Sequence, residues 1–135
     1  IAMRTPWWTA VLLLALIVST YTQDNRYAKF LWIHMDFPMT PARTNYCQNM
    51  IARRCVNAPG TCKDINTFVH APAPNLTTIC ANQPNGSLQN TQQRELVTVC
   101  RLIGGPPNCR YAGTQYNRFV RVRCEDGFPM HLNTT

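Results

Sequence analysis

The sequence "CKDINTFVH", residues 62–70, combines a strand-like alternation with a lysine beside a cysteine. Ile65, Thr67 and Val69 alternate with Asn66 and Phe68, and this period of two residues predicts a half-buried β-strand. Charged side chains normally lie on the solvent face of such a strand. The lysine at position 63 is therefore either a solvated edge residue or a charge directed at a ligand.

The N-terminal 22 residues have the pattern of a secretory signal peptide. Met3 and Arg4 precede the apolar run "AVLLLALIV", residues 10–18, and small or polar residues follow it. This run is too short to span a bilayer, and no later segment approaches the roughly 20 apolar residues that a transmembrane helix needs. We expect removal of residues 1–22, with cleavage just before Gln23. Residues 23–135 then form one small secreted domain.

All seven cysteines lie within this predicted domain. In an oxidising compartment, such a density predicts a disulfide framework that compensates for a modest hydrophobic core. An odd count leaves one thiol over, and the count alone does not choose the pairing. The sequence also contains three glycosylation motifs, which predict surface loops at Asn75, Asn85 and Asn133.

The chain is basic, with a formal net charge of +7 that arginine mostly supplies. The planar guanidinium group suits bidentate contact with phosphates. A polyanionic partner is therefore indicated: RNA, DNA, a heparan-like sugar or an anionic membrane. The alternative interpretation is that the charge only keeps the protein soluble.

The hydrophobic pattern predicts three short helices followed by antiparallel strands. Helices are expected over 26–36, where His34 falls on or beside the apolar face, over 46–54 with Thr44 or Asn45 as N-cap, and over 74–82. Strands are expected over 62–70, 95–103, 118–124 and 128–132, with "GGPPN" as the turn between the second and the third. This order predicts an α+β domain in which a curved antiparallel sheet is joined to short helices by disulfides.

Three histidines are present, His34, His70 and His131. A single histidine in a small protein is more often structural than catalytic. Two histidines can nevertheless act as base and acid in one phosphoryl transfer, and a lysine can stabilise the charge that develops between them.

The segment "CKDINTF" resembles the signature Cys-Lys-x-x-Asn-Thr-Phe of the pancreatic ribonuclease A superfamily. The segments "AKFLWIHMD" and "FPMHL" are similar to those that carry the two catalytic histidines of this family. Six cysteines follow the spacing of its angiogenin-like branch, to which leukocyte ribonucleases of birds and reptiles are related. The resemblance covers essentially all of residues 23–135.

The resemblance implies the RNase A fold and cleavage of RNA on the 3′ side of pyrimidines through a 2′,3′-cyclic phosphate. His34 would accept the proton of the ribose 2′-hydroxyl, His131 would protonate the departing 5′-oxygen, and Lys63 would stabilise the phosphoryl oxygens. No cofactor and no metal would be needed, because side chains and backbone N–H groups stabilise the charge.

The resemblance also implies a set of substrate-binding residues. Thr67 would read the pyrimidine edge, with Asn66 beside it, and the backbone N–H of Leu132 would contact the scissile phosphate. Lys29 corresponds to a residue that contacts a neighbouring phosphate, and Glu125 to one near the second base site. His70 follows the family motif but is not a catalytic position.

The same resemblance implies three disulfides, Cys47–Cys100, Cys62–Cys109 and Cys80–Cys124, and leaves Cys55 as the free thiol. For Cys55, four alternatives stay open: a buried thiol, intermolecular pairing, glutathionylation and a peculiarity of this sequence without a role.

Two residues depart from the family pattern. Ile33 occupies the position of a glutamine that hydrogen-bonds the phosphate, and Asn133 replaces the aspartate that orients the acid histidine. An amide lends no negative charge to an imidazolium, and a glycan on Asn133 could obstruct the site. We therefore expect real but weak ribonuclease activity.

The expected protein is a secreted monomer that acts on single-stranded or tRNA-like RNA in host defence or angiogenesis. A ribonuclease inhibitor is a further expected partner. The alternative is a cationic antimicrobial or receptor- and heparin-binding factor, also able to contact bacterial membranes, which acts independently of cleavage. Its basic residues would be Arg53, Arg54, Arg118, Arg121 and Arg123.

Overall fold

The computed structural model describes residues 25–42 and 44–133, so the predicted signal peptide and its cleavage point lie outside the described residues. Along the described chain, the elements are a first helix at 25–34, α2 (Tyr46–Arg53), β1 (Ile65–Val69), α3 (Pro74–Thr77), the 3₁₀ helix η1 (Thr78–Cys80), β2 (Leu88–Asn90), β3 (Glu95–Gly104), β4 (Arg110–Arg118), β5 (Arg121–Glu125) and β6 (Phe128–Leu132). None of the helices in this part of the chain is both long and apolar enough to cross a bilayer.

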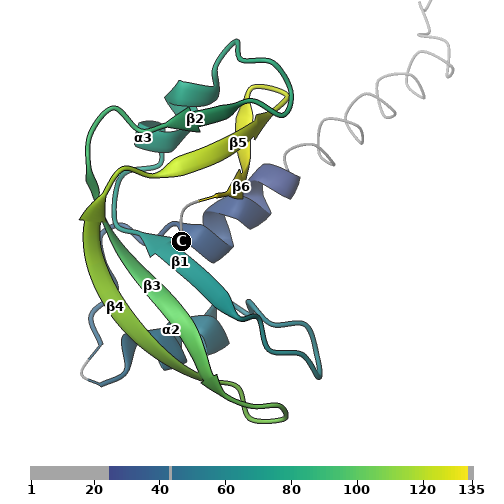
Figure 1. The fold of residues 1–135 in the computed structure, drawn as a ribbon, viewed down its shortest axis with the longest axis vertical. Coiled ribbons are helices and arrows are strands. Elements are labelled where there is room, and N and C mark those ends of the chain that lie inside the picture. The colour runs from purple at the N-terminus through teal and green to yellow at the C-terminus, as the bar shows by residue number, and fades with distance from the viewer. Residues whose placement is uncertain (1–24, 43, 134–135) are drawn as a thin grey trace, which may run out of the picture.

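The strands form two antiparallel sheets of three strands each, in the orders β1-β3-β4 and β2-β5-β6. Figure 1 shows the long, curved β3 and β4 with α2 beside them, and the second sheet at the other end of the molecule next to α3. The predicted α+β architecture of short helices with antiparallel strands is confirmed, although the single expected sheet consists of two.

The strand predicted over 118–124 is confirmed as β5, but it begins three residues later than predicted, because the chain passes from one sheet to the other before Arg121. Arg118 ends β4 and Arg121 begins β5. Thr91 holds the corner between them: its backbone N–H donates to the carbonyl of Val120 (2.8 Å), and its hydroxyl accepts from the N–H of Val120 (3.0 Å). The strands β2 and β4 were not predicted. In β4 only Tyr111 is buried, so the sequence lacks a clear alternation there.

The alternation predicted that strand β1 would be half-buried. Instead, the strand is buried on both faces from Asn66 to Val69. Phe68 packs in a cluster with Met50 and Ile51 of α2. Val69 belongs to the main core, together with Phe30 of the first helix. Helices thus cover both faces of this strand, which explains why its polar positions are buried as well.

Helix α2 begins as predicted, since Asn45 is its N-cap and the Asn45 side chain accepts a hydrogen bond from the N–H of Gln48 (3.1 Å). The helix predicted over 74–82 is shorter. It consists of one α-helical turn followed by η1, and it ends at Cys80.

Three disulfides are present: Cys47–Cys100 and Cys80–Cys124 each join a helix to a strand, and Cys62–Cys109 joins the loop before β1 to the loop before β4. These are the pairs that the family resemblance implies. Gly113 lies opposite Cys100 in the β3–β4 ladder, and a Cβ at this position would stand 2.5 Å from the sulfur of Cys47. The first disulfide therefore requires a glycine on the neighbouring strand.

The thiol of Cys55 is free and exposed, which excludes the buried-thiol alternative. The glycosylation acceptors Asn75, Asn85 and Asn133 are all exposed, and their modification stays a prediction.

Candidate active site

A cleft of about 470 Å³ lies between the first helix, the beginning of β1 and strand β6. Figure 1 shows these three elements side by side near the middle of the molecule. The structure brings every residue predicted as catalytic or substrate-binding to this cleft: Lys29, His34, Lys63, Asn66, Thr67, Glu125, His131 and Leu132. Segments separated by nearly one hundred residues in the chain thus contribute to one site.

His34 is near the end of the first helix, and its side chain is buried beside the ring of Phe30. Its Nδ1 lies 2.9 Å from the carbonyl oxygen of Thr67. Because a carbonyl can only accept, Nδ1 carries the proton, and Nε2 of the neutral ring keeps a free lone pair. The fold therefore selects the tautomer in which Nε2 can act as a base.

The pKa of His34 is lowered from 6.5 to about 4. Burial is the main cause, and the nearby charges of Lys63 and His131 act in the same direction. The hydrogen bond to Thr67 opposes these effects only partly. His34 is consequently neutral at physiological pH, as a proton acceptor must be.

Lys63 lies just before β1, and its Nζ donates to the side-chain oxygen of Asn66 at 2.8 Å. The amide nitrogen of Asn66 donates in turn to the carbonyl of Ile33 at 2.9 Å, so the lysine is connected to the first helix. Burial lowers the pKa of Lys63, and the charge of Lys29 contributes to this. Among the residues that the structure describes, no carboxylate forms an ion pair with Lys63.

His131 lies on β6, and its side chain is largely exposed. Its Nε2 is 3.8 Å from a carboxylate oxygen of Glu125 at the end of β5. Glu125 also lies 3.5 Å from the guanidinium of Arg26, whose other terminal nitrogen is 3.5 Å from Asp126. The carboxylate next to His131 is therefore supplied by Glu125, a role that the sequence did not indicate.

The hydroxyl of Thr67 is buried and has no hydrogen-bond partner among the described residues. Buried polar groups without a partner are rare in native proteins and cost free energy. Since Thr67 lines the cleft, a ligand in the cleft could supply the missing hydrogen bond. Its backbone carbonyl is already used by His34.

His70 lies outside the cleft. Its Nδ1 is 2.9 Å from the carbonyl of Asp36, and its Nε2 is 2.8 Å from the hydroxyl of Thr98. With both ring nitrogens engaged in the protein interior, His70 has a structural role.

Arg26 is a cleft residue that the sequence reasoning missed. Its position one helical turn before Lys29 could have indicated it, because residues three apart share a helix face. Arg54, by contrast, is not a free surface charge. Its guanidinium donates to the carbonyls of Trp32 (2.6 Å) and Met35 (2.9 Å) at the end of the first helix.

The comparisons with known proteins agree with this geometry. Residues 25–133 match the family model of pancreatic ribonuclease. The chain is 49% identical to a ribonuclease homolog of Gallus gallus and 50% identical to the angiogenin of Gallus gallus, in each case over 99% of this chain and 98% of the relative. The crystal structure of green turtle egg-white ribonuclease matches with a TM-score of 0.72 and 40% identity, over 82% of this chain and 98% of the turtle chain. The chain belongs to the pancreatic ribonuclease family.

Proposed function

We propose that this protein is a secreted ribonuclease that cleaves RNA on the 3′ side of pyrimidines through a 2′,3′-cyclic phosphate. The observation that carries the proposal is the His34–Thr67 hydrogen bond of 2.9 Å, which leaves Nε2 of a neutral, buried imidazole free in a cleft shared with His131 and Lys63.

In the first step, Nε2 of His34 accepts the proton of the ribose 2′-hydroxyl. The 2′-oxygen then forms a bond to phosphorus, and the bond from phosphorus to the 5′-oxygen of the next nucleotide breaks. His131, protonated and next to Glu125, gives its proton to that departing oxygen. The need for a 2′-hydroxyl restricts this chemistry to RNA.

Negative charge grows on the phosphoryl oxygens during this step. Lys63 lines the cleft without a carboxylate partner among the described residues, so its ammonium group is available to stabilise that charge. The hydrogen bond from its Nζ to Asn66 directs the amine before the substrate arrives. The backbone N–H of Leu132 is proposed as a second donor to the phosphate.

In the second step the two histidines exchange roles. Neutral His131 accepts a proton from a water molecule, whose oxygen attacks the cyclic phosphate. Protonated His34 returns a proton to the 2′-oxygen as its bond to phosphorus breaks. Both side chains end in their starting protonation states.

Selection of pyrimidines is assigned to Thr67. Its unpartnered hydroxyl can donate to a base acceptor or accept from a base donor, so it can serve both uracil and cytosine. Ile33, an apolar residue of the cleft, offers the phosphate no hydrogen bond, and this supports weak activity. A role in host defence or angiogenesis fits a secreted protein of this kind.

The test is cleavage of poly(U), poly(C), poly(A) and transfer RNA by the refolded protein, beside its His34→Ala and His131→Ala variants. The Arg110→Gln variant, which changes an exposed residue outside the cleft, is the matched control. We expect pyrimidine-selective cleavage that disappears in both histidine variants and persists in the control. Cleavage that persists in either histidine variant, or no cleavage by the unaltered protein, contradicts the proposal and favours a cationic binding factor.

A further inference from the structure

A row of exposed basic side chains extends from the cleft along the outer face of strand β5. In the β5–β6 ladder, Arg123 is directly opposite His131, and directly opposed residues of antiparallel strands point to the same face. Arg121 precedes Arg123 by two residues and therefore shares that face. The intervening Val122 is buried in the core, which fixes the orientation of the strand.

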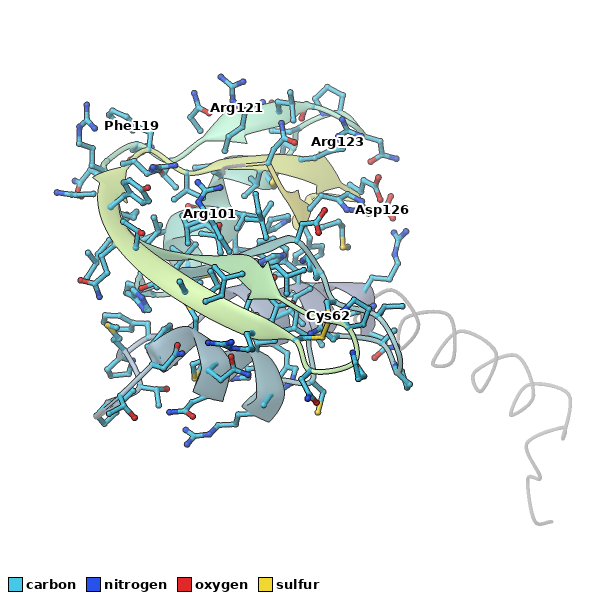
Figure 2. The ribbon with its side chains drawn as sticks, turned by 60° about the horizontal axis from the view of Figure 1, so that its bottom comes forward. Cys62, Arg101, Phe119, Arg121, Arg123 and Asp126 are labelled. Atoms are coloured by element: carbon cyan, nitrogen blue, oxygen red, sulfur yellow. A yellow bond between two sulfur atoms is a disulfide. The ribbon has the colours of Figure 1, made fainter. Side chains whose placement is uncertain are left out.

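We propose that Arg123 and Arg121 bind the phosphates of RNA downstream of the cleavage point, beyond the nucleotide that leaves. This inference rests on the proposed ribonuclease function, because the direction of the RNA follows from the role of His131 as the acid. Figure 2 shows the two arginines in succession along the sheet, with Asp126 in the turn that follows the strand.

The direction of the RNA decides which phosphates meet these residues. His131 protonates the 5′-oxygen of the departing nucleotide, so the downstream part of the chain lies on the His131 side of the cleft. Opposed Cα atoms in an antiparallel ladder are roughly 4.5–5.5 Å apart, which makes Arg123 the cross-strand neighbour of His131. An RNA strand that leaves His131, crosses to Arg123 and then follows β5 meets Arg121 next.

The spacing of the row fits consecutive phosphates. Residues two apart on a strand are separated by roughly 6.6–6.8 Å, which is comparable to the distance between successive phosphates of an extended single strand. Arg121 is oriented by a hydrogen bond from its Nε to the side-chain oxygen of Asn90 at 3.0 Å.

The charge balance distinguishes Arg123 from the other basic residues of this region. Arg26 is paired with Glu125 and Asp126. No carboxylate of the described residues lies within ion-pair distance of Arg123, and its side chain is exposed. A phosphate can therefore approach Arg123 without displacing an existing partner.

Strand β2 supplies an apolar surface beside the row. Leu88 is opposite Arg123 in the β2–β5 ladder and is 43% exposed. A downstream base can rest on Leu88 while its phosphate contacts Arg123. This combination of apolar surface and cation is a common feature of single-strand binding.

The test compares three substrates: the dinucleotide UpA, UpA extended by three adenosines on its 3′ side, and UpA extended by three adenosines on its 5′ side. The double variant Arg121→Gln/Arg123→Gln is measured beside Arg53→Gln/Arg110→Gln, which removes the same charge from exposed positions elsewhere. Thermal unfolding checks that both variants fold.

We expect the ratio of kcat/KM for the 3′-extended substrate to that for UpA to fall by about three- to tenfold in the Arg121/Arg123 variant only. The ratio for the 5′-extended substrate stays the same. An unchanged 3′ ratio, or an equal loss in the control, overturns the inference. If the Arg121/Arg123 variant loses binding to heparin or anionic vesicles while its kcat/KM ratio for the 3′-extended substrate is unchanged, the inference is also overturned. The two arginines would then bind a polyanion other than RNA.

A separate binding measurement distinguishes failure of this inference from failure of the proposed function. The probe is the 3′-extended oligonucleotide with a 2′-deoxyuridine, which the site cannot cleave, and fluorescence anisotropy reports its dissociation constant. If no substrate is cleaved, weaker binding by the Arg121/Arg123 variant still supports phosphate binding by these two arginines. The slope of the logarithm of the binding constant against the logarithm of the salt concentration should then be smaller by roughly 0.7 for each lost phosphate contact. Unchanged binding overturns the inference.

Discussion

The imidazole of His34 is tied to the backbone of Thr67 by a hydrogen bond of 2.9 Å between Nδ1 and the carbonyl oxygen. The same threonine presents an unpartnered hydroxyl to the cleft. Thr67 therefore orients the imidazole of His34, the proposed proton acceptor, and also presents the hydroxyl that is proposed to bind the pyrimidine. Proton abstraction and selection of the pyrimidine are coupled through a single residue, so a pyrimidine that is bound by Thr67 also lies next to His34.

The low pKa of His34 predicts an unusually acidic limb in the pH dependence of kcat/KM. The base acts only when neutral, so activity is lost as the pH falls through the pKa of His34, which is about 4. The measurement is kcat/KM for UpA across the acid range, with an NMR titration of the His34 ring. A half-point near 6.5, the ordinary value for histidine, contradicts the prediction.

Replacement of Thr67 by valine separates substrate selection from stability. Valine keeps the shape of the side chain and removes a hydroxyl that has no partner, so the free energy of unfolding stays the same or rises. The carbonyl that holds His34 is part of the backbone and remains. We expect kcat/KM for poly(U) and poly(C) to fall by about tenfold. Thr67→Ser is the control, because it keeps the hydroxyl, and an equal loss in both variants contradicts the assignment.

Ile33 in the cleft predicts a gain of activity on substitution. A glutamine at this position on the first helix can donate a hydrogen bond to the phosphate, which isoleucine cannot. We expect Ile33→Gln to raise kcat/KM by about three- to tenfold, equivalent to roughly 1 kcal/mol. Ile33→Leu controls for the change of shape. No gain in the glutamine variant, or an equal gain in the leucine variant, contradicts the proposal that Ile33 weakens the activity.

Sequence patterns that act over a few residues correctly predicted the start of α2 and the position of β1. Asn45 caps α2 as the sequence indicated, and β1 lies within the predicted range, because a capping side chain and a run of β-formers act over a few residues. Strand β4 was missed because eight of its nine residues are not fully buried, so its pairing with β3 stabilises it without an apolar alternation.

The cleft itself was predicted through family resemblance, not through periodicity. Its residues come from the first helix, β1 and β6, and no local pattern reveals that these meet. The contact between His131 and Glu125 was missed for a related reason. It depends on the turn at Asp126 and Gly127, which brings the end of β5 beside β6.

Arg54 is expected to stabilise the C-terminal end of the first helix, which carries His34. The first helix ends with carbonyl groups that lack intrahelical partners, and the guanidinium of Arg54 donates to two carbonyls there, those of Trp32 and Met35. It also stacks 4.4 Å from the ring centroid of Trp32 and lies 3.3 Å from the carboxylate of Asp36. Only 14% of the Arg54 side chain is exposed, so these contacts are poorly screened by water.

Arg54→Met keeps most of the apolar stem and removes every donor. We expect the free energy of unfolding to fall by about 2 kcal/mol, because hydrogen bonds from a charged group are lost and Asp36 loses a partner. We also expect a lower kcat well below the unfolding temperature, since His34 lies between Trp32 and Met35 on the loosened end of the helix. Arg53→Met is the matched control: it removes the same charge one residue earlier, from an exposed side chain. Chemical denaturation and UpA cleavage measure the two effects, and equal changes in both variants would show that charge alone, not the capping of the first helix, is responsible.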